Sequence, residues 1–150
     1  PQDRSSAASD VYKRQGGGMP GIIVAIILKN MKNNMNVHLY EKSYHKSHFL
    51  KEVSKKLNLN TKVFQKNIFE IKNLETGTIM SRAFKPMPVV LELVYENFSK
   101  YKNLIFFMGK SGKKIFENSK KNWELEYIEK KSLTSEDSFL INIKKIKKKN

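Results

Sequence analysis

The sequence predicts a single α/β domain built on a mostly parallel, doubly wound sheet. Predicted helices and strands alternate through most of the chain, which is typical of parallel strands joined by crossover helices. A cluster of glycines stands directly before an apolar helix, and two strands without a helix between them end the pattern. The 150 residues suffice for one domain. We therefore expect residues 16–150 to form it.

The first fifteen residues, PQDRSSAASDVYKRQ, are polar and lack helical or strand periodicity. We expect residues 1–15 to be a disordered leader. The stretch SSAASDVYKRQ resembles translated adaptor or library sequence, so we also expect the leader to be foreign to the protein. On this interpretation the strand that should lead into the glycine cluster is missing, and the domain is truncated at its N-terminus.

The first half of the predicted domain holds two helices and three strands. A proline and the apolar run after it predict a helix over residues 20–31, and alternating apolar residues predict a strand over 36–41. Apolar residues at helical spacing predict a second helix over 44–57. Short stretches containing β-branched residues then predict strands near 61–65 and over 77–81.

The second half ends differently from the first. Two closely spaced prolines predict the start of a helix over 89–100, and the apolar run 104–108 is the most strand-like of the chain. A helix is expected over 111–121. Residues 123–131 and 138–146 then predict two consecutive strands, which should pair antiparallel at the far edge of the sheet.

The charge balance favours a polyanionic partner. The chain has 29 Lys+Arg against 14 Asp+Glu, a net charge of +15, and we expect residues 144–149 to form a basic tail. The absence of cysteine excludes disulfides and thiolate metal sites and fits a reducing compartment, so we expect a cytoplasmic protein. The longest apolar run, residues 22–28, is far shorter than the roughly 20 residues that span a membrane.

The glycine cluster has the spacing of a nucleotide-binding loop. Gly16, Gly18 and Gly21 match G-x-G-x-x-G, and the helix that follows would direct its N-terminal N–H groups at a ligand. Glu41 lies twenty residues beyond Gly21, where an acid that binds ribose hydroxyls is expected. The spacing alone is equally compatible with a glycine-rich linker, and Glu41 with an ordinary solvated acid at a strand end.

Other candidate residues lie at the ends of predicted strands or shortly after them. In an open α/β sheet, ligands bind at the carboxyl ends of the strands, so Glu41, Asn67 and the pair Ser81 and Arg82 should converge on one edge. Arg82 could bind a carboxylate, phosphate or base edge, and Phe84 could stack on a ligand. The alternative is a surface arginine with Phe84 in the core.

Several other motifs do not support a site. Gly109, Lys110 and Ser111 resemble the end of a P-loop, but the position that requires its first glycine is Leu104. His45 and His48 are three residues apart on a predicted helix and lack a third ligand, so we expect a structural pair and no metal site. There is no G-x-S-x-G motif, and no cysteine could serve as a nucleophile.

Three segments together resemble one family. They are GGGMPGI at 16–22, HKSHFL at 45–50 with Val53, and SRAF at 81–84. The chain is similar over about residues 16–146 to the RsmG (GidB) family, whose members use S-adenosylmethionine (SAM) to methylate a guanine N7 in small-subunit (16S) ribosomal RNA. The resemblance implies a Rossmann-like class I SAM-dependent methyltransferase fold.

The resemblance also implies roles for particular residues. Arg82 would be the catalytic residue, facing the cofactor or the target base. The cofactor-binding residues would be Gly16, Gly18 and Met19 around the methionine part of SAM, Glu41 on the ribose, and Asn67, Ile68 and Phe69 beside the adenine. The sequence departs from the family at Tyr12 and Arg14, where the family has aspartate and glycine, and at Lys46, where arginine is usual.

The implied partner is small-subunit ribosomal RNA of a bacterial ribosome. The lysine excess would bind its backbone, and Lys46, Lys110 and Lys113 are the candidate contacts. Guanine N7 carries a lone pair and no proton, so the absence of an evident acid/base pair fits this reaction. We expect a monomer. The alternatives are an NAD(P)-dependent oxidoreductase, which would share the glycine spacing and the acid, and a non-catalytic RNA-binding protein, which would share only the charge.

Overall fold

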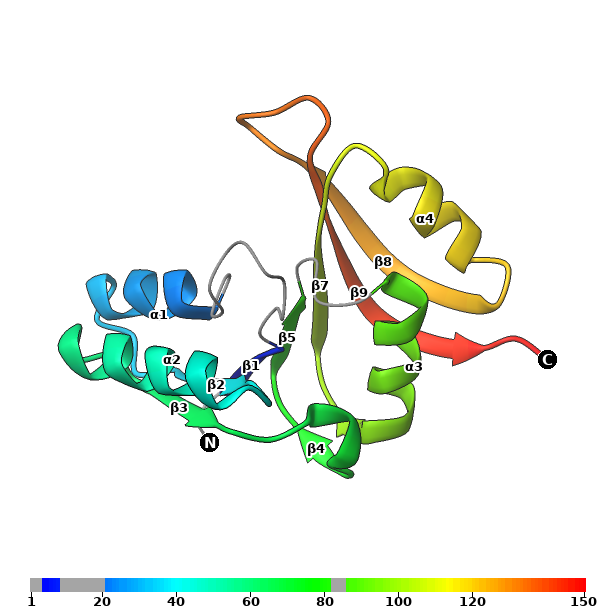
Figure 1. The fold of residues 1–150 in the computed structure, drawn as a ribbon. Helices are drawn as coiled ribbons and strands as arrows, with labels where there is room; N and C mark the ends of the chain where they lie inside the picture. Colours follow the sequence, from blue (N-terminus) through cyan, green and yellow to red (C-terminus); the bar gives the residue numbers. More distant parts are fainter. Residues whose placement is uncertain (1–3, 9–20, 82–85) are drawn as a thin grey trace.

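The structure is a computed structural model that describes residues 4–8, 21–81 and 86–150. Its main feature is a seven-stranded sheet (Figure 1). The strands, in their order across the sheet, are β3 (Thr61–Phe64), β2 (Asn36–Tyr40), β1 (Arg4–Ala8), β5 (Thr78–Ser81), β7 (Asn103–Met108), β9 (Phe139–Lys148) and β8 (Trp123–Lys131). The helices are α1 (Gly21–Asn30), α2 (Tyr44–Lys56), α3 (Met87–Asn97) and α4 (Gly112–Ser119).

The pairing of the strands confirms the predicted sheet. The neighbours β3, β2, β1, β5 and β7 are all parallel, whereas β9 is antiparallel to both β7 and β8. The last two strands thus form the expected antiparallel pair at one edge. Strand β8 has the bounds that the sequence predicts, and β9 begins one residue later than expected.

The expectation that no strand precedes the glycine cluster is wrong. Arg4–Ala8 forms β1 in the centre of the sheet, where it pairs with β2 on one side and β5 on the other. Its serines and alanines have no strand-like alternation. A central position, however, offers backbone hydrogen-bond partners on both sides, and these do not depend on side-chain pattern. The foreign origin of residues 1–15 stays a prediction.

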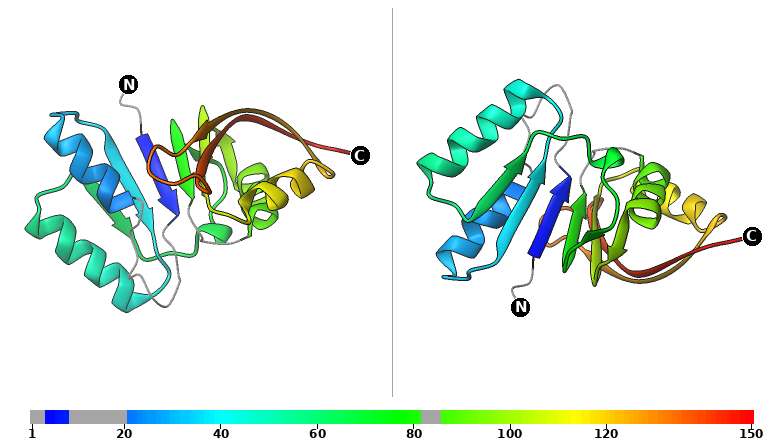
Figure 2. Two further views of the ribbon diagram at one scale, coloured as in Figure 1. Left: turned by 90° about the horizontal axis from the view of Figure 1, so that it is seen from above. Right: turned by 90° about the horizontal axis from the view of Figure 1, so that it is seen from below.

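The helices cover opposite faces of the sheet. Helices α1 and α2 lie beside the β3–β2–β1 end, and α3 and α4 beside the β7–β9–β8 end (Figure 2). Val37 and Leu39 of β2 are fully buried in a small core with Leu50 of α2. The larger core forms around α3 and includes Leu104 of β7 and Ile141 of β9. Alternate residues of β2 therefore pack in the small core with α2, and residues of β7 and β9 pack in the larger core with α3.

The predicted helix over 89–100 and the predicted basic tail differ most from the structure. The helix expected to reach residue 100 ends at Asn97, because Phe98–Lys100 form β6, which pairs with β4 (Leu74–Glu75) in a separate two-stranded sheet. The expected basic tail is mostly strand, since β9 extends to Lys148 along β8. Lys148 donates to Glu92 of α3 at 2.7 Å, so this lysine joins the end of the sheet to α3.

Candidate functional site at the carboxyl edge of the sheet

The carboxyl ends of the five parallel strands meet at one edge of the sheet. Tyr40, the last residue of β2, is the register partner of Ala8 at the end of β1 and of Phe64 at the end of β3. On the other side of β1, Ser81 at the end of β5 is opposite Phe106 near the end of β7. Ligands of open α/β sheets bind at this edge. The residues that follow these strands are therefore the candidates for a binding site.

Glu41 is buried at this edge. It directly follows β2, only 1% of its surface is exposed, and its backbone N–H donates to the carbonyl oxygen of Phe64 at 3.0 Å. Its Oε1 accepts a hydrogen bond from the backbone N–H of Ser43 at 2.9 Å, whereas Oε2 has no hydrogen-bond partner among the described residues. Because its side chain is buried, Glu41 is not an ordinary solvated acid. Its Oε2 is available to accept a hydrogen bond from a ligand hydroxyl.

The start of α2 holds the segment that carries Glu41. Ser43 is the N-cap residue of α2, and its hydroxyl oxygen accepts a hydrogen bond from the backbone N–H of Lys46 at 3.4 Å. The N-terminus of a helix carries a partial positive charge, which favours a carboxylate nearby. Burial raises the pKa of the neighbouring Tyr40, whose ring stacks on Phe64 with centroids 4.9 Å apart.

The three residues predicted to lie beside the adenine form a rigid turn after β3. Asn67 accepts a hydrogen bond from the backbone N–H of Phe69 at 3.1 Å and caps the short 3-10 helix η1 (Ile68–Glu70). Ile68 is buried in the larger core, and Phe69 packs against that core. Asn97 of α3 donates from Nδ2 to the carbonyl oxygens of Ile68, Phe69 and Ile71 at 3.3, 3.0 and 2.6 Å. The turn is thereby held against α3, and its contact with a cofactor stays a prediction.

The remaining predicted site residues adjoin this edge in the sequence. Ser81 ends β5 and is buried, and Arg82 is the next residue. Gly16, Gly18, Met19 and Arg82 lie outside the described residues. The roles predicted for the glycine cluster and for Arg82 therefore stay predictions.

The three predicted RNA-contacting lysines lie on segments that follow the carboxyl ends of strands. Lys46 is half-buried in the first turn of α2, which follows β2. Lys110 and Lys113 are exposed in the loop after β7 and at the start of α4. Their positions are compatible with an RNA substrate at this edge, and their contacts with RNA stay a prediction.

The histidine pair has no metal-site geometry. His45 and His48 are exposed on α2, and Nε2 of His48 lies 4.0 Å from Oε1 of Glu52. Residues 4–8, 21–81 and 86–150 contain no group of three or more His, Cys, Asp or Glu that could hold a metal ion. Within the same residues, no helix has the length and apolar character needed to cross a membrane.

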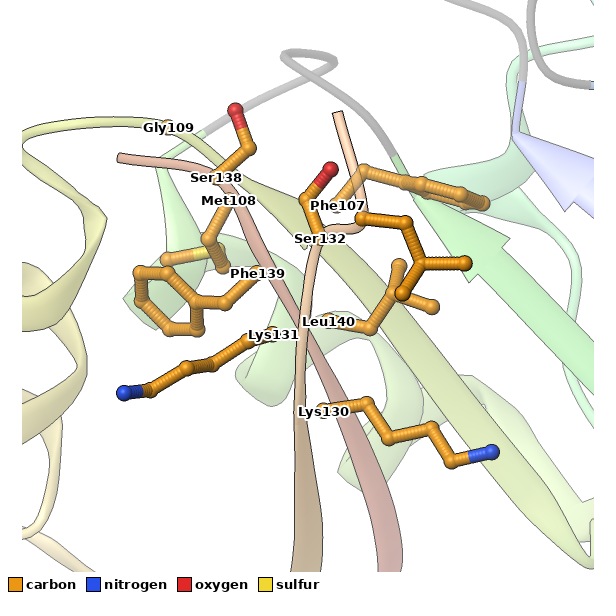
Figure 3. A pocket seen from close by; sticks show the side chains of 10 residues that line it. Phe107, Met108, Gly109, Lys130, Lys131, Ser132, Ser138, Phe139 and Leu140 are labelled. Carbon is orange, nitrogen blue, oxygen red and sulfur yellow. The ribbon is translucent and has the colours of Figure 1, made fainter. Parts of the chain in front are cut away.

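A pocket that the sequence analysis missed lies at the carboxyl end of β7. It has a volume of about 720 Å³ and is lined by residues from Phe107 to Gly109, by the end of β8, by the start of β9 and by the loop between these two strands (Figure 3). The loop, residues 132–138, projects beyond the end of β7 (Figure 1). The sequence predicts the antiparallel pairing of β8 and β9 but not the register of β9 on β7, which brings the three sides of the pocket together.

The fold is shared with solved structures, one of which is an rRNA methylase. M. jannaschii TYW2 in complex with AdoMet matches with a TM-score of 0.58 at 13% identity, over 99% of this chain and 70% of that chain. An rRNA methylase from Streptococcus thermophilus matches with a TM-score of 0.57 at 10% identity, over 97% of this chain and 89% of that chain. At such identities the likeness shows the fold alone, which is that of the class I SAM-dependent methyltransferases.

Sequence comparison identifies the family. The chain is 64% identical over 135 residues to ribosomal RNA small subunit methyltransferase G of Pelagibacter ubique (strain HTCC1062), covering 90% of this chain and 63% of the relative. It is 26% identical over 133 residues to the protein of that name from Ruegeria sp. (strain TM1040), covering 89% of this chain and 65% of the relative. The chain thus spans less than two thirds of each relative. The GidB family model, rRNA small subunit methyltransferase G, matches residues 10–141. This chain therefore belongs to the GidB family of rRNA small subunit methyltransferases.

Proposed function

We propose that the protein transfers a methyl group from SAM to N7 of a guanine in small-subunit ribosomal RNA. The observation that carries the proposal is the buried carboxylate of Glu41, whose Oε2 has no partner among the described residues. It stands at the carboxyl edge of a class I methyltransferase sheet, in a chain that belongs to a family of rRNA methyltransferases. A ligand with hydroxyl groups at this edge would satisfy the unpaired oxygen.

Different residues of the chain would bind different parts of SAM. Glu41 would accept hydrogen bonds from the ribose hydroxyls, and the turn at 67–69 would flank the adenine. The glycines and Met19 in residues 16–21 would line the methionine part, where glycine allows close approach of the backbone. When bound, SAM would supply an electrophilic methyl group.

In this proposal, Arg82 positions the target guanine. An arginine can donate a hydrogen bond to O6 of guanine while N7 beside it stays free. N7 carries a lone pair and no proton, so the protein needs no general base for this reaction. Its contribution is to hold N7 in line with the methyl group, because correct placement of two reactants can supply much of the rate. We assign this placement to Arg82, the residue after buried Ser81.

The lysine excess would bind the RNA backbone. The net charge of +15 attracts a polyanion, and the exposed Lys110 and Lys113 with the half-buried Lys46 are the proposed contacts. Such an enzyme would act as a monomer in the cytoplasm, where ribosomal RNA is found.

The proposal is tested by ligand binding and by methyl transfer. SAM and NAD(H) are titrated against the protein by calorimetry, and methyl-labelled SAM is then offered with small ribosomal subunits that lack N7-methylguanosine. We expect SAM to bind and the label to reach a guanine N7, located by chain cleavage at the modified base. Binding of NAD(H) without SAM would favour the oxidoreductase. RNA binding without SAM binding or label transfer would favour a non-catalytic RNA-binding protein.

A further inference from the structure

The pocket at the end of β7 has the properties of a nucleotide-binding site. We propose that it receives one unstacked nucleotide of the RNA substrate, with its base against Phe107 and its phosphate beside Lys130. This inference rests on the proposed function, because it takes RNA as the substrate. The cavity volume of about 720 Å³ lies within the range of small-ligand sites and accommodates one nucleotide.

Three residues form one row across the strands that line the pocket. Phe107 of β7 is the register partner of Leu140 of β9, which is in turn the partner of Lys130 of β8. Residues paired in this way point to the same face of a sheet. Figure 3 shows the three side chains pointing to the same side, away from Met108 in the adjacent row. One face of the pocket therefore carries an aromatic ring, an aliphatic side chain and a cation side by side on three neighbouring strands.

The apolar part of this row lies outside the hydrophobic cores that the described residues form. Phe107 and Leu140 are half-buried and belong to neither hydrophobic cluster of the described residues. One residue along each strand, Phe139 is buried in the larger core and Met108 packs against it. Within the described residues, the ring of Phe107 therefore has no place in a hydrophobic core, and it can serve as a stacking surface for a base. Such stacking accepts any base, because every base has a π-face.

The row stands on the same edge of the sheet as Glu41. Ser81 at the end of β5 is opposite Phe106, so Phe107 lies one residue beyond the end of β5. Strands β1 and β5 separate β2 from β7, which places Phe107 three strand spacings, about 14 Å, from the end of β2. This separation leaves room for a cofactor at Glu41 and a nucleotide at Phe107 side by side.

The charges around the pocket favour a phosphate-bearing ligand. Lys130 and Lys131 are exposed at the end of β8 and line the pocket, and Lys110 directly follows Gly109, another lining residue. The exposed Glu136 and Asp137 of the loop do not line it. An apolar peptide could cover Phe107 but would leave the lysines without partners. The combination of ring and cations selects a nucleotide.

The test compares two single-stranded RNA hexamers, one with a central purine and one abasic at that position. Their affinities for the full 150-residue chain are measured by fluorescence anisotropy at fixed salt. We expect the wild-type protein to bind the purine strand more tightly. Phe107→Leu keeps an apolar side chain but removes the ring, so it should weaken the purine strand about tenfold and leave the abasic strand unchanged. Lys130→Ala should weaken both strands equally, because it removes a phosphate contact.

Lys55→Ala serves as the matched control, since Lys55 is exposed in the last turn of α2, away from the pocket. Circular dichroism identifies any variant that does not fold, and the comparison of the two strands on wild-type protein needs no variant. Equal affinity of wild-type protein for the two strands would overturn the proposal. So would a folded Phe107→Leu protein that still prefers the purine strand. SAM titration of the wild-type protein distinguishes the two hypotheses. If the protein binds SAM but does not prefer the purine strand, only the proposed nucleotide pocket is wrong. If it prefers the purine strand but does not bind SAM, only the proposed methyl transfer is wrong.

Discussion

The backbone N–H of Ser43 donates a hydrogen bond to Oε1 of Glu41 at 2.9 Å and leaves Oε2 of the same buried carboxylate without a partner among the described residues. The Ser43 bond fixes the orientation of the carboxylate, so that its second oxygen is oriented before a ligand arrives. A preoriented acceptor binds hydroxyl groups with little further loss of side-chain entropy.

Glu41→Gln should therefore weaken SAM binding. The amide keeps the volume of the side chain but removes the charge, and hydrogen bonds to charged groups contribute about 1.5–3 kcal/mol, so the affinity should fall roughly 10- to 100-fold. Calorimetric titration with SAM measures the change. Glu52→Gln is the control, because the side chain of Glu52 is 52% exposed on α2. An unchanged affinity in folded Glu41→Gln protein would exclude the ribose role of Glu41.

RNA affinity should fall steeply with salt. Each phosphate neutralised by a lysine contributes about −0.7 to the slope of log K against log salt for a single strand. Changing both Lys110 and Lys113 to alanine should reduce this slope by about 1.4 if each contacts one phosphate. Anisotropy titrations between 50 and 200 mM salt give the slope, with Lys55→Ala as the control. A flat dependence on salt would contradict electrostatic binding of the backbone.

Asn97→Asp should destabilise the protein. Nδ2 of Asn97 donates to the carbonyl oxygens of Ile68, Phe69 and Ile71, and the side chain is buried. A carboxylate there would face three acceptors without a proton to donate, at a cost of about 3 kcal/mol. Urea denaturation measures the free energy of unfolding. Asn122→Asp, at an exposed residue, should change it by less than about 0.5 kcal/mol, and a similarly small effect at Asn97 would refute the prediction.

Gly112→Ala should also destabilise the protein, whereas Gly109→Ala should not. A Cβ at Gly112 would stand 2.7 Å from Cβ of Met108, and this atom cannot move without the backbone of β7. Overpacking of this kind costs about 1–3 kcal/mol. A Cβ at Gly109 meets nothing within 4 Å. Thermal melts of the two variants should differ by several degrees, and equal melting temperatures would show that α4 shifts freely.

Ser6→Pro tests the central position of β1. Ser6 is the register partner of His38 on one side and of Ile79 on the other. Proline removes a backbone donor and is not tolerated inside a sheet, so we expect a loss of about 3 kcal/mol or more. Ser6→Ala keeps the backbone N–H and serves as the control. If both variants unfold at the same urea concentration as the wild-type protein, β1 contributes nothing to the stability of the sheet.

The sequence by itself determined the alternation of strands and helices and the antiparallel pair at the end of the chain. These features depend on local hydrophobic periodicity, which is why 123–131 was predicted with the bounds that β8 has. It also determined which residues would lie at the carboxyl edge, because Glu41, Asn67 and Ser81 stand at the ends of predicted strands or just after them.

Only the tertiary structure decided the rest. The position of β1 depends on hydrogen bonds with the backbones of β2 and β5. The serine and alanine side chains of β1 do not predict this position. The burial of Glu41, with Oε1 bonded to Ser43 and Oε2 without a partner in the part of the chain that the structure describes, depends on how β2 and the start of α2 pack together. The row of Phe107, Leu140 and Lys130 depends on the register in which β7, β9 and β8 pair. Register is a property of pairing, so no single segment contains it.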